Sequence, residues 1–145
     1  MLSQPRVTVS DVISAPVDEV WGAIRGFDRI DEWHPAITGC TIEDGLAPDQ
    51  VGAVRNFQAG EKSLREKLLA HSDIDRHYQY TILDGAGAKA DYLSEMRAIP
   101  ITETDETLVV WTGKFDAEPG AMADEIEGTN KVYTAGLEGL SEAFE

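Results

Sequence analysis

Residues 14–35 read SAPVDEVWGAIRGFDRIDEWHP and mark the point where the chain passes from a strand into helices. Pro16 suits the first position of a helix, where its missing N–H costs nothing. The apolar residues that follow recur at helical spacing and form one face: Val17, Val20, Trp21, Ile24 and Phe27. A second short helix is expected over 28–33, because Pro35 disfavours a helical conformation in the residue before it. This stretch therefore predicts two short helices in succession.

Strands are predicted on both sides of this helical stretch. On its N-terminal side, apolar and polar residues alternate over 6–14, which is the pattern of a half-buried strand. On its C-terminal side, turn signals such as Gly60-Glu61 separate further alternating runs, which predict six strands: 37–43, 51–58, 62–71, 76–84, 90–99 and 107–116. The connections between these six strands are short, and short connections indicate an antiparallel meander.

From residue 120 onward the apolar pattern returns to the helical period. One stripe contains Met122, Ile126, Tyr133, Leu137, Leu140 and Phe144. This pattern predicts one long helix over 120–143. Gly128, Gly136 and Gly139 interrupt it, and each costs about 1 kcal/mol relative to alanine. Either close packing against the sheet or space for a ligand would offset that cost.

The predicted fold class is α+β, with one seven-stranded antiparallel sheet. Only the C-terminal helix is long enough to cover the apolar face of that sheet. A length of 145 residues suits a single domain over 1–145. The two short helices are expected to connect the first strand to the second.

Composition narrows the range of partners. The net charge is -15, and the 12 Lys and Arg residues are spread along the chain, so nucleic-acid binding through phosphate contacts is excluded. No apolar run approaches the roughly 20 residues that cross a bilayer, so membrane insertion is not expected. The first residues contain no apolar core of a signal peptide, which predicts a cytoplasmic location. The excess of acidic residues is interpreted as a feature that keeps the protein soluble or adapts it to high salt.

Two charged residues fall on the apolar side of their predicted strands, namely Arg55 and Glu66. A two-residue turn at Gly60-Glu61 places residue 55 directly opposite residue 66, and glycine at the first turn position fits a type II′ hairpin. An ion pair between them is expected, because an unpaired charge on the inner face would be costly. Two roles remain open: a structural pair near the rim, or polar recognition of a ligand.

The chain also contains tyrosines, histidines and one cysteine that could carry chemistry. Tyr78, Tyr80 and Tyr92 share the inner face, either as aromatic packing or as hydroxyl groups available to a ligand. The histidines His34, His71 and His77 lack metal-binding spacing, and the last two are predicted to point outward. The single cysteine, Cys40, is interpreted as a small packed residue. No phosphate-binding glycine loop or G-x-S-x-G motif is present, so neither a cofactor nor a metal is expected.

Four stretches together resemble a known family: SAPVDEVWGAIRGFDRIDEWHPAI, VGAVRNF, LREKLLAHSDIDRHYQYTIL and VYTAGLEGL. They are similar to the bacterial polyketide cyclase/dehydrase-like branch of the SRPBCC superfamily, which has the START-like helix-grip fold. The resemblance implies a curved sheet wrapped on the C-terminal helix. It also implies an elongated, mostly apolar cavity between them, often gated by loops beside the short helices.

Two functions are compatible with these patterns. The first is binding of a small hydrophobic or aromatic ligand, lipid-like or polyketide-like, by a monomer or homodimer. The expected lining residues are Trp33, Phe57, Leu68, Tyr78, Tyr80, Tyr92, Trp111, Phe115 and Tyr133. The alternative is a cofactor-free enzyme of the cyclase or dehydratase type. It would use Glu66, a tyrosine or His34 as acid or base, with Arg55 stabilising an enolate oxygen.

A weaker third hypothesis is a protein-interaction partner whose gate surface changes with ligand occupancy. In all three hypotheses Trp33 forms a wall at the edge of the cavity, and His34 beside it is a candidate for the entrance.

Overall fold

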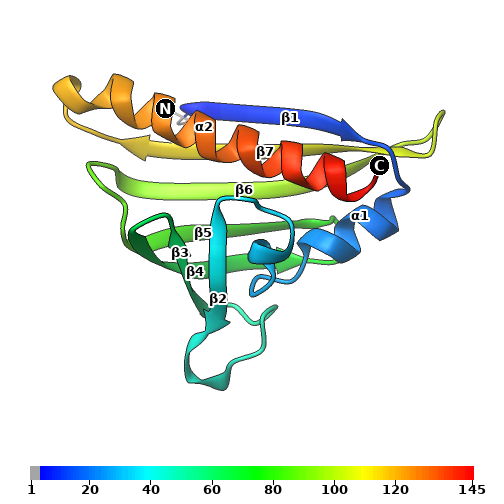
Figure 1. Ribbon diagram of the computed structural model, residues 1–145, viewed down its shortest axis with the longest axis horizontal. Coiled ribbons are helices and arrows are strands. Elements are labelled where there is room, and N and C mark those ends of the chain that lie inside the picture. Colours follow the sequence, from blue (N-terminus) through cyan, green and yellow to red (C-terminus); the bar gives the residue numbers. More distant parts are fainter. Residues whose placement is uncertain (1–3) are drawn as a thin grey trace.

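The computed structural model describes residues 4–145, so residues 1–3 of the predicted domain lie outside the described residues. The elements follow the predicted order of one strand, short helices, six strands and a long helix (Figure 1). Their bounds are β1 Val7–Ile13, α1 Val17–Ile24, η1 Ile30–Glu32, β2 Ile37–Ile42, η2 Glu43–Gly45, β3 Val54–Ala59, β4 Lys62–Ser72, β5 His77–Asp84, β6 Ala90–Ile101, β7 Glu106–Asp116 and α2 Pro119–Ala143. The predicted α+β helix-grip class is confirmed.

The seven strands form one antiparallel sheet in the order β1-β7-β6-β5-β4-β3-β2. The sheet curves around α2, which runs along it from one end to the other, while α1 lies near the C-terminal end of α2 (Figure 1). The buried apolar core fills the space between this helix and the inner face of the sheet. Within residues 4–145, no helix combines the length and apolarity needed to cross a membrane.

Most predicted bounds agree with the structure to within two residues, and the larger differences lie around β2 and β3. The strand expected over 51–58 begins only at Val54, because Gly52 has a φ of 97° and Val51 is exposed. The helix expected over 28–33 is a single 3-10 turn of three residues, η1. The 3-10 turn η2, which follows β2, was not predicted from the sequence.

A β-bulge in β4 overturns the predicted orientation of His71. Leu68 pairs with Tyr80 and Ala70 pairs with Gln79, so β4 advances by two residues where β5 advances by only one. Such an extra residue reverses the facing of every side chain beyond it. The side chain of His71 is consequently only 6% exposed, and its ring lies 5.6 Å from that of Trp21.

The surroundings of Gly128, Gly136 and Gly139 show why α2 contains glycine at these positions despite its cost in helix stability. A Cβ on Gly136 would lie 2.7 Å from both the His34 ring and the Trp111 ring. A Cβ on Gly139 would meet the backbone carbonyl of Trp33. Gly128, by contrast, has no atom within 4 Å of such a Cβ and borders a cavity. Close packing therefore explains Gly136 and Gly139, whereas Gly128 lies beside open space.

Alanine substitutions at two of these glycines should have opposite effects. Gly136→Ala should lower the free energy of unfolding by about 1–3 kcal/mol, because the added methyl overpacks the core against two rings. Gly128→Ala should raise it by up to about 1 kcal/mol, because it improves helix propensity without a clash. Urea denaturation followed by circular dichroism measures both. If Gly136→Ala proved as stable as Gly128→Ala, the close packing of α2 would be wrong.

Candidate ligand-binding site

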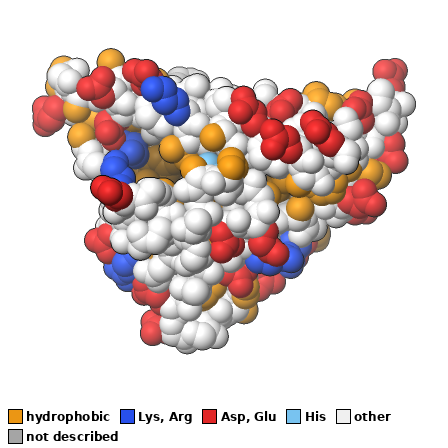
Figure 2. Space-filling model, viewed as in Figure 1, with side chains coloured by type: hydrophobic (Ala, Val, Ile, Leu, Met, Phe, Trp, Pro, Cys, Tyr) orange, Lys and Arg blue, Asp and Glu red, His pale blue; other side chains and the backbone are white. Residues whose placement is uncertain are grey.

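A cavity of about 210 Å³ lies between the first half of α2 and the inner face of the sheet. Figure 2 shows a hollow floored with hydrophobic side chains beneath α2, with Lys or Arg side chains at its edge. The residues around the cavity come from η1, the η1–β2 connection, β2 to β7, the β5–β6 connection and α2: Ile30, Ala36, Ile37, Phe57, Ala59, Lys62, Leu64, Glu66, Tyr80, Ile82, Gly85, Lys89, Tyr92, Trp111, Glu125, Gly128, Thr129, Val132 and Tyr133. The walls are mostly aromatic and aliphatic, as in small-molecule sites.

The β3–β4 hairpin places Arg55 opposite Glu66, as predicted from the turn. Gly60 has a φ of 64° and Glu61 does not share a positive φ, which is the pattern of a type II′ turn. The Nε and one Nη of Arg55 both donate to the same carboxylate oxygen, Oε1 of Glu66, at 2.9 and 2.7 Å. The expected ion pair on the inner face is therefore present.

Arg55 itself is not a cavity residue. Its side chain is completely buried, and its other Nη donates to the backbone carbonyl of Phe27 at 3.1 Å. The guanidinium lies 4.0 Å from the centroid of the Phe27 ring and 4.8 Å from that of Tyr80. Since all of its surface is in contact with protein, the expected direct contact between Arg55 and a ligand is not available. Arg55 instead fixes the position of the Glu66 carboxylate.

Glu66 lines the cavity and keeps one carboxylate oxygen unpaired. Its Oε2 has no hydrogen-bond partner among residues 4–145, while Oε1 is occupied by Arg55. Burial away from water raises the pKa of Glu66, although the Arg55 guanidinium opposes this shift. A carboxylate in this setting can accept a hydrogen bond from a ligand or take up a proton.

A hydrogen-bond network runs behind the aromatic wall. The indole Nε1 of Trp111 donates to the Tyr80 hydroxyl at 3.1 Å and to Ser94 Oγ at 3.0 Å. Ser94 Oγ in turn donates to the carbonyl of Thr112 at 3.0 Å and lies 2.9 Å from the Tyr133 hydroxyl, which also contacts Tyr92. Burial raises the pKa of all three tyrosines, so their hydroxyls stay protonated.

The Tyr80 hydroxyl is the member of this network that can serve a ligand. It accepts the indole hydrogen of Trp111, and its own hydrogen can be donated either to the Tyr133 hydroxyl or to a ligand. Tyr80 also lines the cavity. The cavity therefore offers one carboxylate acceptor, Glu66, and one hydroxyl donor, Tyr80.

The predicted site residues divide into two groups. The cavity is lined by Glu66, Phe57, Tyr80, Tyr92, Trp111 and Tyr133. The other candidates are buried away from it: Arg55, His34, Trp33, Leu68, Tyr78 and Phe115. Sequence reasoning did not select Ser94 as a site residue, although its position on the same face of β6 as Tyr92 was a usable signal. It also missed Lys62, Lys89 and Glu125, which border the cavity from the start of β4, the β5–β6 connection and α2.

His34 is a structural residue and not an entrance residue. Its side chain is buried against α2, with Nε2 donating to the Val132 carbonyl at 2.8 Å. Its Nδ1 accepts the backbone N–H of Ala36 at 3.2 Å, so both ring nitrogens are engaged. Burial lowers the pKa of His34, which keeps the ring neutral. The expectation that His34 faces the entrance is therefore wrong, because the ring packs beneath Gly136.

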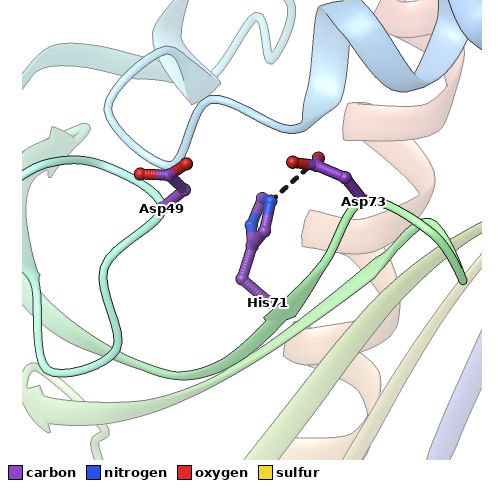
Figure 3. Close-up of side chains that lie close together, drawn as sticks. All are labelled: Asp49, His71 and Asp73. Carbon is purple, nitrogen blue, oxygen red and sulfur yellow. Dashed lines mark hydrogen bonds and ion pairs between the residues drawn. The ribbon is translucent and has the colours of Figure 1, made fainter.

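Asp49, His71 and Asp73 come together at the far end of the sheet (Figure 3). Asp73 Oδ1 accepts hydrogen bonds from Trp21 Nε1, Arg25 Nε and His71 Nε2 at 2.9, 2.9 and 3.0 Å. Arg25 also reaches Asp49 and holds the pKa of Asp73 well below its usual range. Arg25 thus supplies the positive charge that a metal ion would bring, and the cluster ties α1 to the end of β4.

The sequence is similar to a known protein family and to several solved structures. Residues 4–145 match the family described as polyketide cyclase/dehydrase and lipid transport. A solved structure of a protein from Nitrosospira multiformis is 29% identical, with a TM-score of 0.83, and the match covers 96% of this chain and 95% of that one. The protein XoxI from Bacillus cereus is 27% identical, with a TM-score of 0.85 and coverage of 95% and 94%. A protein from Thermobifida fusca is 29% identical, with a TM-score of 0.84 and coverage of 95% and 91%. No curated protein gives a significant match to the sequence.

Proposed function

Because this chain belongs to the polyketide cyclase/dehydrase and lipid transport family, a branch of the SRPBCC superfamily, we propose that it binds a small aromatic molecule between α2 and the sheet. The family and the fold suggest a domain that binds hydrophobic ligands. The proposal adds the chemical class of the ligand, and it rests on the cavity.

The observation that carries the proposal is an aromatic cavity with one unpaired acceptor and one hydroxyl donor in its wall. The acceptor is Oε2 of Glu66, and the donor is the hydroxyl of Tyr80. A dry cavity of about 150 Å³ can bind benzene. The volume of about 210 Å³ therefore suits one substituted ring and is small for a long lipid chain. A phenol satisfies both groups, since its hydroxyl donates to Glu66 and accepts from Tyr80.

Binding of p-cresol tests the proposal. It is a neutral single ring with one hydroxyl, and we expect a Kd of about 0.1–1 mM, since a 1 mM Kd corresponds to about -4.1 kcal/mol. In an NMR titration, the saturating amide shifts should be concentrated around Glu66, Tyr80 and Trp111.

Two leucine variants on β4 provide the control. Leu64→Trp places a bulky indole ring in the cavity and should abolish the saturable shifts, whereas Leu69→Trp changes an exposed position on the same strand and should bind like wild type. Unsaturable shifts in the wild type, or equal binding by Leu64→Trp, would contradict the proposal.

A second candidate function is proton transfer at a carbon next to a carbonyl. The specific observation in its favour is the unpaired oxygen of Glu66 together with its raised pKa. Glu66 would take the proton from carbon while the electron pair moves to the carbonyl oxygen. The Tyr80 hydroxyl would donate a hydrogen bond to that enolate oxygen, and the proton would then return from Glu66 to carbon.

Deuterium exchange separates binding from catalysis. In D₂O, the wild type should accelerate exchange of the benzylic protons of 4-hydroxyphenylacetone, and Glu66→Gln should lower that acceleration by about 100-fold or more. The p-cresol affinity of a folded Glu66→Gln variant should change by less than about tenfold, or 1.4 kcal/mol. Equal exchange by both proteins would eliminate Glu66 as the base and leave binding as the function.

A further inference from the structure

The border of the cavity is positively charged in an acidic protein. The chain has a net charge of -15 and five lysines, at 62, 67, 89, 114 and 131. Two of them, Lys62 and Lys89, border the cavity. Figure 2 shows Lys or Arg side chains beside the hollow, on a face that also carries many scattered acidic side chains. A neutral apolar ligand gives no reason for this placement.

The charges at the border do not cancel. Lys89 pairs with Glu125 of α2 at 3.0 Å, and both side chains are mostly buried. Lys62 is exposed and forms no ion pair with any residue in the range 4–145. The three side chains therefore sum to one positive charge, carried by an ammonium group whose hydrogen-bond donors are available.

The Lys62 ammonium and the Glu66 carboxylate lie on the same strand, β4, at opposite ends of the cavity. Lys62, Leu64 and Glu66 are spaced by two residues and all line the cavity. Because a strand advances about 3.4 Å per residue, the Cα atoms of Lys62 and Glu66 lie roughly 13 Å apart. Aromatic side chains occupy the walls between them. The cavity thus has an acceptor at its inner end and a cation at its outer end.

We propose that the ligand is a small hydroxyaryl carboxylate, with its hydroxyl at Glu66 and Tyr80 and its carboxylate at Lys62. This inference deepens the proposed function and rests on it. The aromatic ring provides the buried apolar area, while the two ends provide the orientation. An ion pair at the border favours the anion and also attracts it from solution past a negatively charged surface.

Three probes of similar size isolate the terminal charge: 4-hydroxyphenylacetate, tyrosol and tyramine, which carry a carboxylate, an alcohol and an ammonium group. At pH 7 and low salt, the carboxylate should bind about threefold to fivefold more tightly than the alcohol, the size of effect expected of a solvent-exposed ion pair. The amine should bind least tightly. The preference should shrink as salt is added, because the pair is exposed to screening.

Lys62→Gln should remove the preference for 4-hydroxyphenylacetate over tyrosol, leaving tyrosol affinity within about twofold. Lys67→Gln is the matched control, since it removes the same charge from an exposed position on the same strand. Equal affinities for all three probes, or tighter binding of tyramine, would overturn the inference and leave the proposed function intact. A preference that survives in Lys62→Gln would show that Lys62 is not the partner. Absence of binding by all three would overturn the proposed function as well.

Discussion

Arg55→Met should lower the free energy of unfolding by about 3–5 kcal/mol, because it leaves a buried carboxylate without its partner. Arg55 is completely buried, and its guanidinium supplies both hydrogen bonds to Oε1 of Glu66. It also ties the β3–β4 hairpin to the carbonyl of Phe27. Urea denaturation followed by circular dichroism measures the loss.

The double variant Arg55→Met/Glu66→Leu distinguishes a charge effect from a packing effect. Replacing both partners of a buried pair by apolar residues is often neutral or stabilising, so the double variant should recover most of the lost stability. If Arg55→Met alone cost less than about 1 kcal/mol, or if the double variant were less stable than the single one, the pair would not be buried and coupled as described. Recovery would show that the stability lost in Arg55→Met comes from the unpaired Glu66 carboxylate and not from lost packing.

Trp111→Ala should cost about 3–5 kcal/mol, the range for truncating a buried tryptophan. The ring is 1% exposed and stacks on Tyr133 with 4.2 Å between ring centroids. It also lies against Trp33 and His34. Truncation would remove these contacts and enlarge the cavity that Trp111 lines. The free energy of unfolding of the variant, measured in urea, tests this.

Trp111→Phe distinguishes the contribution of ring packing from that of the indole hydrogen bonds. Phenylalanine keeps the stacking but cannot donate to Tyr80 and Ser94, so the loss should be about 1–3 kcal/mol, the cost of unsatisfied buried polar groups. A loss below 1 kcal/mol in Trp111→Ala would show that the ring does not pack as described.

Much of the fold could be predicted because its signals are local. The spacing of apolar residues changes from a period of 2 to a period of 3.6, which identified the strands and the long helix. The short turns implied the antiparallel meander. The cross-strand pairing of Arg55 with Glu66 followed from a two-residue turn containing Gly60, since loop length sets hairpin register. Boundaries were less accurate where one residue, such as Gly52, redirects the backbone.

The orientation of His71 could not be predicted from alternation. An extra residue in β4 reverses the facing of the strand, and its position depends on how β4 pairs with β5. The same dependence on distant contacts applies to His34. Its ring is engaged by the Val132 carbonyl of a helix nearly a hundred residues further along the chain.

The sequence by itself determined the order of the strands and the long helix, the apolar stripe of that helix and the ion pair of the β3–β4 hairpin, because each depends on spacing within a short segment. Only the tertiary structure decided which inward side chains reach the cavity. Glu66 and Tyr80 line it, while Arg55 and Tyr78, on the same faces of β3 and β5, are buried away from it. The physical reason is that the curvature of the sheet and the contact line of α2 divide one inner face into a packed part and an open part. Gly136 allows the close contact, and Gly128 borders the opening.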